Sequence, residues 1–219
     1  MILWYNPLMT AGKEEKMLFK KGIVLLFLCA LSVLFASCGP SNTAEHQTAA
    51  YTVTDIEGTA VDFPAPPKRI VTLSMSTDEV MLGLVEPARI AAVNSLLDDP
   101  VSSNVTGLVK EIPQRIGNPT VEEIMALHPD LVVVPDWGDL TMVASLREAG
   151  LKVIVCKGAT NLAEIRETIQ LLAAAAGVPE RGEKLLSMMD CKLAEIQEKV
   201  AKIPQDERKR VVLISLMGG

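Results

Sequence analysis

Aromatic residues are scarce in this sequence: Phe, Trp and Tyr make up 4% of its 219 residues. The core must therefore consist mainly of Val, Ile, Leu, Ala and Met, a composition that suits layers of helices and strands. The content of 49% hydrophobic and 22% charged residues is ordinary for a globular protein, so disorder is not expected. The net charge of −6 and the lack of a Lys/Arg cluster argue against a nucleic-acid-binding protein, because contacts to phosphates require a basic face.

A short apolar run occupies residues 22–36 and follows two lysines. A secretory signal typically has a cationic start, then about 7–15 apolar residues, and then small residues at the cleavage site. The apolar run is short for a membrane-spanning helix. Cys38 lies where a bacterial lipoprotein signal places its lipidated cysteine, and the residues before it resemble the lipobox, with Phe35 as a departure. We therefore predict an N-terminal extension and signal peptide over residues 1–37 and a lipidated tether over residues 38–50. Ordinary signal cleavage nearby is the alternative.

Only two cysteines lie beyond Cys38. Cys156 ends a predicted strand, and Cys191 lies on a predicted helix. An exported protein can form disulfides, but unpaired cysteines are among the most buried residues. We therefore expect two buried thiols, with a disulfide as the alternative.

Strands and helices alternate along the middle of the chain, after a small hairpin predicted over residues 51–63. Apolar runs without polar alternation, which are typical of parallel strands covered on both faces, lie at residues 69–74, 89–93, 130–135 and 151–156. The helices between them are expected to begin at three capping boxes and one capping aspartate: Ser76 with Glu79, Thr120 with Glu123, Asn161 with Glu164, and Asp139. The pattern predicts a Rossmann-like α/β lobe with a mostly parallel sheet over residues 51–178, in which residues 96–116 form a loop region with short elements.

A long amphipathic helix is predicted next, over residues 179–204. Apolar side chains recur along it at steps of three and four: Leu185, Met189, Leu193, Ile196, Val200 and Ile203. At 1.5 Å per residue it spans about 35 Å, the breadth of a small domain, so it can act as a rigid connector. A further buried strand is predicted over residues 210–216. A terminal parallel strand has no sheet to join unless more chain follows, so we interpret residues 205–219 as the start of a truncated second lobe.

Four stretches of the sequence resemble one protein family in their order and spacing. They are PPKRIVTLS at 66–74, IGNPTVEEI at 116–124, ALHPDLV at 126–132 and LREAGLKV at 146–153. Together they are similar to the periplasmic-binding proteins for ferric siderophores, haem and cobalamin, the class with a single helical backbone between its lobes. The resemblance covers residues 51–219. It implies two α/β lobes that flank a ligand cleft and are joined by one long helix, and it places residues 179–204 at that helix.

The resemblance implies a substrate-binding protein and not an enzyme. Such a protein would capture an iron chelate, either a siderophore or haem, or a cobalamin-type ligand in the cleft. It would then deliver this ligand to the permease subunits of an ABC importer in the membrane. Held by its lipid, it is expected at the cell surface or in the periplasm. No cofactor is expected apart from the ligand.

Two other functions remain open. One is an exported α/β enzyme, since parallel sheets host many chemistries. The sequence contains no Gly-x-Ser-x-Gly, no glycine-rich phosphate loop, no His-Glu-x-x-His and no Cys-x-x-Cys, so we predict no catalytic residue. The other is a binding protein for a free zinc or manganese ion, which needs several converging His and carboxylate ligands. Of the two histidines, His46 lies in the tether and His128 is interpreted as structural, so we predict no metal site.

Candidate ligand-binding residues lie where predicted strands end, because open α/β sheets bind ligands outside the carboxyl ends of their strands. These residues are Ser74, Met75, Ser76, Asp136 and Trp137. The aromatic face of Trp137 can pack on a macrocycle or a chelate, with the filling of a gap between lobe and loop as the alternative. Two further candidates are Arg115 and Asn118. Many relatives carry aromatic residues just before the position of Asn118, where this chain has Arg115, Ile116 and Gly117. Arg115 can attract an anionic siderophore or be a solvated loop residue.

Glu122 matches the family position whose carboxylate docks onto a basic pocket of the permease. Since Glu123 is assigned to the capping box, Glu122 is expected to point outward. The alternative is that a glutamate in the first turn of a helix stabilises the helix dipole. The partner carboxylate of the family belongs to the second lobe.

Overall fold

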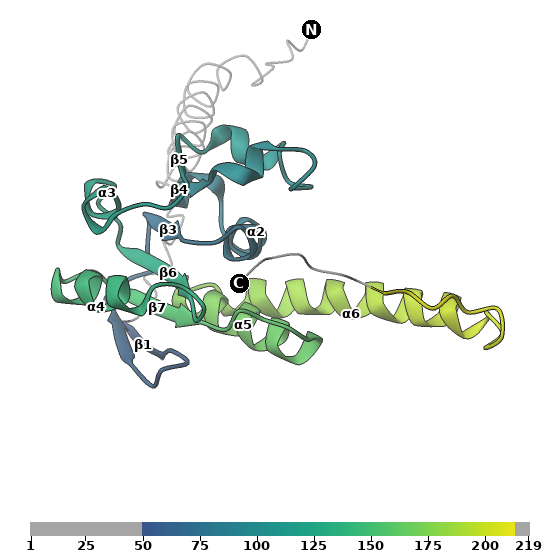
Figure 1. Ribbon diagram of the computed structural model, residues 1–219. Helices are drawn as coiled ribbons and strands as arrows, with labels where there is room; N and C mark the ends of the chain where they lie inside the picture. The colour runs from purple at the N-terminus through teal and green to yellow at the C-terminus, as the bar shows by residue number, and fades with distance from the viewer. Residues whose placement is uncertain (1–49, 213–219) are drawn as a thin grey trace, which may run out of the picture. The chain divides into compact units, whose positions relative to one another are not determined.

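A computed structural model describes residues 50–212, and at its centre lies a parallel sheet of five strands in the order β5-β4-β3-β6-β7 (Figure 1). The strands are β3 (Ile70–Thr72), β4 (Ile90–Asn94), β5 (Gln114–Ile116), β6 (Leu131–Pro135) and β7 (Val153–Cys156). Four of them match the predicted apolar runs. β5 lies inside the predicted loop region, because an edge strand with a Gln-Arg sequence lacks the apolar pattern of a covered strand. The Rossmann-like α/β prediction is confirmed.

The first strand of the sheet, β3, lies between β4 and β6. The chain adds β4 and β5 on one side of β3 and then crosses to add β6 and β7 on the other side. The order therefore reverses between β3 and β6, which pair from Ile70 with Leu131 to Thr72 with Val133. Such a reversal leaves a crevice at the carboxyl ends of the two strands. This topology brings the residues that follow β3 close to those that follow β6.

Helices cover both faces of the sheet. They are α2 (Met75–Leu84), α3 (Val121–Ala126), α4 (Leu140–Glu148), α5 (Leu162–Ala175) and α6 (Pro179–Ala201). In β6, Leu131 and Val133 join the apolar cluster formed with α2 and α5. Val132 and Val134 point the other way and join the cluster formed with α3 and α4. All five positions of β6 are buried, which explains why its sequence shows no polar alternation.

An antiparallel hairpin precedes the sheet, as predicted. It consists of β1 (Tyr51–Thr54) and β2 (Ala60–Phe63). The ring of Phe63 is buried and stacks on Tyr51, with 5.2 Å between the ring centroids. The Tyr51 hydroxyl donates a hydrogen bond to the carbonyl oxygen of Ala175 at 3.0 Å, which ties the hairpin to the end of α5. Short 3-10 turns lie around β4 and before β5: η1 (Pro87–Arg89), η2 (Ser95–Asp98) and η3 (Leu108–Glu111).

Two of the motifs that carry the family resemblance hold each other in place. The carboxylate of Asp130, just before β6, accepts hydrogen bonds from the N–H groups of Lys68 and Arg69 at 2.6 and 2.8 Å. The Arg69 guanidinium donates to the carbonyl oxygens of Leu127 and His128. His128 has a left-handed backbone with a φ of 48°, a conformation that His adopts more readily than most residues. These contacts fix the starts of β3 and β6, and they agree with the structural interpretation of His128.

The starts of three helices follow the sequence. Thr120 caps α3 in a complete capping box with Glu123, and Asp139 caps α4. Asn161 caps α5 as predicted. The Glu164 carboxylate, however, accepts hydrogen bonds from the N–H and hydroxyl of the neighbouring Thr160, so the predicted reciprocal box with Asn161 is not formed.

The start of α2 differs from the prediction. Ser74 is the N-cap residue: its backbone is extended, and its side-chain oxygen accepts a hydrogen bond from the N–H of Thr77 at 3.3 Å. Ser76 already lies within the helix, so the capping box predicted for Ser76 and Glu79 is wrong. The physical reason is that α2 begins directly after β3, and the cap falls on the last residue whose backbone is still extended.

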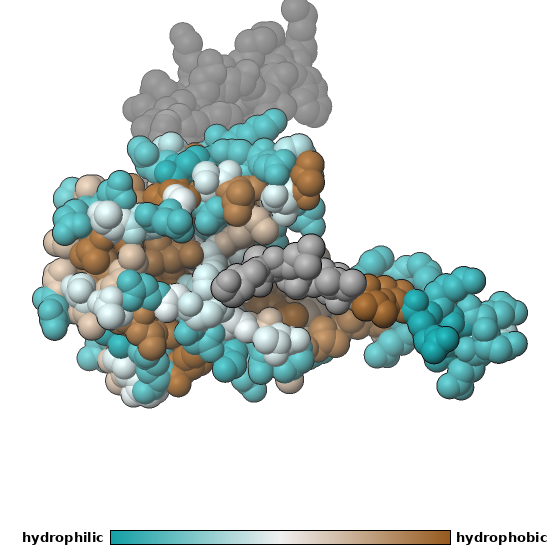
Figure 2. Space-filling view, viewed as in Figure 1, coloured by the Kyte–Doolittle hydropathy of each residue, from teal (hydrophilic) through white to brown (hydrophobic). Residues whose placement is uncertain are grey.

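The long helix predicted over residues 179–204 is present as α6 (Pro179–Ala201). Its first part packs against α5 and buries Leu186. Its later part runs on beyond the lobe (Figure 1) and exposes 46% of Ile196 and 42% of Val200. On the face seen in Figure 2, hydrophilic residues cover most of this end of the helix and the segment after it.

Several predictions fall partly or wholly outside the described residues. The signal segment 1–37 and Cys38 lie outside them. Of the strand predicted over residues 210–216, residues 210–212 are not in a strand, and the remainder lies outside the described part of the chain. Within residues 50–212, no helix combines the length and apolar character needed to cross a membrane.

The two cysteines of the described region are both free thiols. Cys156 is buried at the end of β7, as predicted. Cys191 is exposed, and the prediction that it is buried is wrong. It lies on the exposed side of α6, next to Asp190, which pairs with Arg166 of α5.

Candidate functional site

The carboxyl ends of β3, β6 and β7 meet at one edge of the sheet. A pocket of about 300 Å³ lies there, between the first turns of α2, the loops after β6 and β7, and α5. The side chains that give it its chemical character are Ser76, Trp137, Lys157 and Thr168. The pocket lies beside the switch point between β3 and β6, the position at which open α/β sheets bind ligands.

The three predicted residues after β3 take different places. The Ser74 hydroxyl is buried as the cap of α2 and lies 2.7 Å from the hydroxyl of Thr77, so it is committed to the helix start. Met75 is half-buried and packs against the main apolar cluster. Ser76 is exposed and lines the pocket. The structure therefore presents one of the three side chains, Ser76, to the pocket.

Trp137 follows β6 and leaves 67% of its side chain exposed. Its indole ring lies against Gly158, where an added Cβ atom would overlap the ring. The ring therefore rests on the backbone of the loop after β7 and forms one wall of the pocket. Trp137 thus contacts the loop and, being 67% exposed, also offers an open face of its ring to the pocket.

Asp136 joins the loops after β6 and β7. Its Oδ1 atom accepts a hydrogen bond from the N–H of Gly158 at 2.8 Å, and its Oδ2 atom lies 3.1 Å from the ammonium group of Lys157. The Gly158 N–H and then Lys157 hold the pKa of Asp136 below its usual range, so this carboxylate is ionised at neutral pH. Asp136 thereby keeps Gly158 in the position on which the indole ring lies.

The sequence interpretation missed Lys157, although a signal for it was present. Lys157 directly follows β7, just as Asp136 directly follows β6. Because parallel strands end at the same edge of a sheet, the rule that selected Asp136 selects Lys157 equally well. Lys157 adds a positive charge to this pocket, whereas the predicted residues that line it, Ser76 and Trp137, are uncharged.

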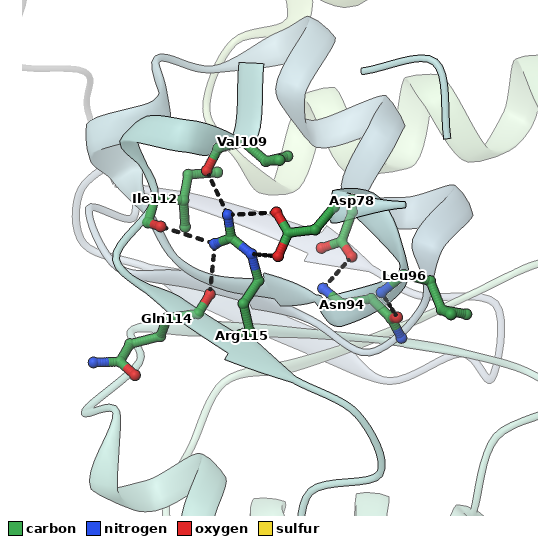
Figure 3. Close-up of polar contacts among 8 residues, drawn as sticks. Asp78, Asn94, Leu96, Val109, Ile112, Gln114 and Arg115 are labelled. Carbon is green, nitrogen blue, oxygen red and sulfur yellow. Dashed lines mark hydrogen bonds and ion pairs between the residues drawn. The ribbon is translucent and has the colours of Figure 1, made fainter. Parts of the chain in front are cut away.

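Arg115 lies elsewhere, on the edge strand β5 (Figure 3). Its guanidinium forms a bidentate ion pair with Asp98, with N to O distances of 2.7 and 2.9 Å. Its other N–H groups donate to the carbonyl oxygens of Val109, Ile112 and Gln114. A guanidinium has five N–H donors, and these contacts engage all five. Arg115 therefore holds together the segment before β5, which favours a structural role over attraction of a ligand.

Asn118 is exposed and lines a second pocket, of about 370 Å³, between β5 and α3. β5 and β6 are separated in the sheet by β4 and β3, so this pocket is not the one beside Trp137. The predicted ligand residues are thus divided between two places. Ser76 and Trp137 line the pocket at the switch point, and Asn118 and Arg115 line the pocket at the sheet edge.

A buried carboxylate, Asp78, lies between α2 and the strands β3 and β4. It accepts hydrogen bonds from the Thr72 hydroxyl and from the N–H of Asn94, the latter at 2.8 Å (Figure 3). Burial raises the pKa of Asp78 to about 7, while the bonds from Thr72 and Asn94 act in the opposite direction. Asp78 links the helix that begins at the pocket to the two strands behind it. Nothing in the sequence pattern marked it as buried.

Glu122 lies exposed in the first turn of α3. Its neighbour Glu123 accepts a hydrogen bond from the N–H of Thr120 at 2.8 Å, which completes the capping box and leaves Glu122 outside it. The Glu122 N–H and the Thr120 hydroxyl hold the pKa of Glu122 below its usual range. The side chain is therefore an ionised surface carboxylate, as both a docking role and a helix-dipole role require.

The pocket at the switch point offers groups that can bind a ligand. It offers an indole face, hydroxyl groups and one ammonium group. Among residues 50–212, no group of three or more His, Cys, Asp and Glu side chains is arranged to hold a metal ion.

Comparison with known proteins gives one family. Residues 70–219 match the family described as periplasmic binding protein. The uncharacterized ABC transporter substrate-binding lipoprotein YvrC of Bacillus subtilis is 26% identical over 89% of this chain and 63% of its own length. The probable siderophore-binding lipoprotein YfiY of Bacillus subtilis is 25% identical over 91% and 62%. The cobalamin-binding protein of Halobacterium salinarum is 26% identical over 77% and 49%. The chain thus spans less than two thirds of each of these relatives.

Solved structures share the fold. The molybdate periplasmic binding protein MolA of Haemophilus influenzae, bound to molybdate, aligns with a TM-score of 0.60 at 17% identity, over 72% of this chain and 56% of MolA. The heme binding protein HmuT aligns with a TM-score of 0.57 at 24% identity, over 70% of this chain and 50% of HmuT. With its parallel sheet, its crevice at the carboxyl ends of the strands and the matched residues, the chain belongs to the periplasmic binding protein family.

Proposed function

We propose that this protein is an exported solute-binding lipoprotein that captures an iron chelate or a cobalamin-type ligand and delivers it to an ABC importer. The observation that carries this proposal is the position of Trp137. A large aromatic side chain, 67% exposed, forms a wall of the pocket at the switch point of the sheet. Macrocycles and aromatic chelates present flat faces that an indole ring can cover.

The names of the relatives support this class of ligand. One relative is described as a probable siderophore-binding lipoprotein, another as a cobalamin-binding protein, and a structural neighbour as a heme binding protein. Two Bacillus subtilis relatives are also described as lipoproteins, which supports a lipid on Cys38. Glu122 is the proposed contact to the permease.

A second lobe is part of the proposal. The apolar positions Ile196 and Val200 of α6 are exposed in the described part of the chain, although they continue the face that Leu186 begins to bury. A face of this kind is stabilised by packing against another element. We infer that a second lobe packs there and closes the pocket from the opposite side.

Ligand titration of the purified protein tests the proposal. Intrinsic Trp fluorescence is followed while haem, cyanocobalamin, ferric enterobactin or ferrioxamine B is added, and equilibrium dialysis measures the bound ligand directly. At least one of these probes is expected to bind and to change the fluorescence. The Trp137→Phe variant should lose most of this change, because Trp137 is the one tryptophan of the sequence that follows the predicted signal peptide. Absence of binding for all four probes in dialysis would overturn the proposed function.

A further inference from the structure

We propose that Lys157 is an anion-binding residue of the pocket beside Trp137, and that the protein therefore selects negatively charged ligands over neutral or cationic ones. The ligand class is an aromatic or macrocyclic chelate with an anionic edge, such as a ferric catecholate or a porphyrin with carboxylates. This inference rests on the proposed function, because it concerns the ligand of the same pocket.

The first observation is the composition of the pocket wall. Among the described residues that line the pocket, Lys157 carries the one charged side chain. The other lining groups are apolar or are uncharged hydroxyls, such as those of Ser76 and Thr168. Asp136 pairs with Lys157 but is not among the residues that line the pocket. The first turn of α2 also faces the pocket, and the partial positive charge of a helix N-terminus acts in the same direction as the ammonium group.

The second observation is that the backbone of Lys157 is fixed while its ammonium group can exchange partners. The Thr168 hydroxyl donates to the carbonyl oxygen of Lys157 at 3.3 Å, and the next residue, Gly158, is held by Asp136. The Lys157 side chain is 44% exposed, and its ammonium group lies 3.1 Å from Asp136. A lysine ammonium on a flexible four-carbon stem can rotate away from one acceptor toward another.

The pair can open without leaving Asp136 unsatisfied. When Lys157 turns toward a ligand, Oδ1 of Asp136 keeps its 2.8 Å hydrogen bond from Gly158, and the carboxylate, whose side chain is 29% exposed, remains open to water. Asp136 first, and then Glu164 and Glu167, raise the pKa of Lys157 above its usual value, so its ammonium group is charged at neutral pH. An anionic group on the ligand therefore replaces Asp136 as the partner of Lys157. A cationic ligand gains no such contact.

The test compares two ferric chelates of opposite charge. Equilibrium dialysis measures binding of the trianionic ferric enterobactin and of the monocationic ferrioxamine B to the purified wild-type protein and to the Lys157→Gln variant. The matched control is Lys184→Gln, which removes an exposed lysine from α6. We expect Lys157→Gln to weaken binding of ferric enterobactin about tenfold, the loss of one charge-assisted hydrogen bond, and to leave ferrioxamine B within about twofold. Lys184→Gln should change neither.

Each outcome decides between the two proposals. If the wild-type protein prefers ferrioxamine B, or if Lys157→Gln weakens both chelates equally, the role of Lys157 in selecting anions is overturned while the binding function stands. If neither chelate binds, and haem and cyanocobalamin do not bind either, the proposed function falls as well. A tenfold loss of affinity that is confined to ferric enterobactin supports the inference. A decrease in the affinity of the wild-type protein for ferric enterobactin when NaCl is added supports it as well.

Discussion

The position of Trp137 depends on a neighbouring glycine. The indole ring lies against Gly158, and a Cβ atom at this position would overlap the ring and lie 3.0 Å from the Asp136 carboxylate. The backbone of Gly158 is not left-handed, so the absence of a side chain here serves the close approach of Trp137 and not a turn. Gly158 and Asp136, on two adjacent loops, thus position one aromatic wall of the pocket.

Substitution of Gly158 by Ala should displace the indole ring. The added methyl group occupies the place of the ring, so the fluorescence of Trp137 is expected to shift to longer wavelength and ligand affinity to fall several-fold. Stability should change by no more than about 1 kcal/mol, because the backbone conformation accepts Ala. Gly107→Ala is the matched control, since no atom lies within 4 Å of a Cβ there. An unchanged emission spectrum and an unchanged affinity in Gly158→Ala would contradict this account.

Replacement of Glu122 by Arg should separate delivery from binding. Glu122 is an exposed carboxylate in the first turn of α3, and reversal of its charge removes the proposed ion pair with the permease. We expect ligand binding by the purified protein to stay within about twofold, while uptake by cells that depend on this protein falls about tenfold or more, as for a charge-assisted contact at an interface. Glu148→Arg, at the exposed end of α4, is the control. Equal uptake by the two variants would argue for a helix-dipole role of Glu122.

At the scale of secondary-structure elements, α2 is fastened to the sheet by a carboxylate whose ionisation is costly. Asp78 lies fully buried and accepts hydrogen bonds from Thr72 of β3 and Asn94 of β4. Its pKa is about 7 in the folded protein, whereas a carboxyl in the unfolded chain titrates near 4. The folded state therefore binds this proton more tightly than the unfolded state does. The contribution to stability is complete below pH 4, is lost as the pH rises toward 7 and is constant above that value.

The stability of the protein should accordingly decrease between pH 5 and pH 8. The expected decrease in the free energy of unfolding is on the order of 2 kcal/mol, measured by urea denaturation at both pH values. Asp78→Asn should remove most of this decrease, because the amide accepts the hydrogen bond from Asn94 without carrying a charge. Glu183→Gln, on the exposed face of α6, should behave like the wild-type protein. If Asp78→Asn retains the full pH dependence, another group causes it.

The sequence predicts the elements better than the site. Apolar runs identify β3, β4, β6 and β7 because both faces of these strands are covered, whereas the polar edge strand β5 gives no such signal. A local hydrogen-bond pattern identifies the complete cap at Thr120, but two nearby serines compete for the start of α2, and only the backbone decides in favour of Ser74. Arg115 looks like a free loop cation because its partner Asp98 lies 17 residues earlier in the chain. To predict which residues share a pocket, one must know the order of the strands in the sheet, and the sequence does not give this order directly.

At the scale of the whole molecule, α6 connects the described lobe to what we infer to be a second one. The chain spans 63% and 62% of the lengths of two Bacillus subtilis relatives. Its α6 buries Leu186 against the lobe and exposes Ile196 and Val200 farther along. One wall of the proposed cleft, with Trp137 and Lys157, is therefore described, and the opposite wall is a proposal.

The proposed lipid anchor can be tested through two cysteines of the N-terminal segment. Cys38 follows small residues at the predicted cut site, whereas Cys29 lies inside the apolar run. In cells fed a labelled fatty acid, the wild-type protein should be labelled and should sediment with membranes. Cys38→Ser should lose the label and leave the membrane fraction, because stable anchoring requires acyl chains in the bilayer. Cys29→Ser should behave like the wild-type protein. Label retained by Cys38→Ser would show that the anchor lies elsewhere, and a wild-type protein without label would favour ordinary signal cleavage.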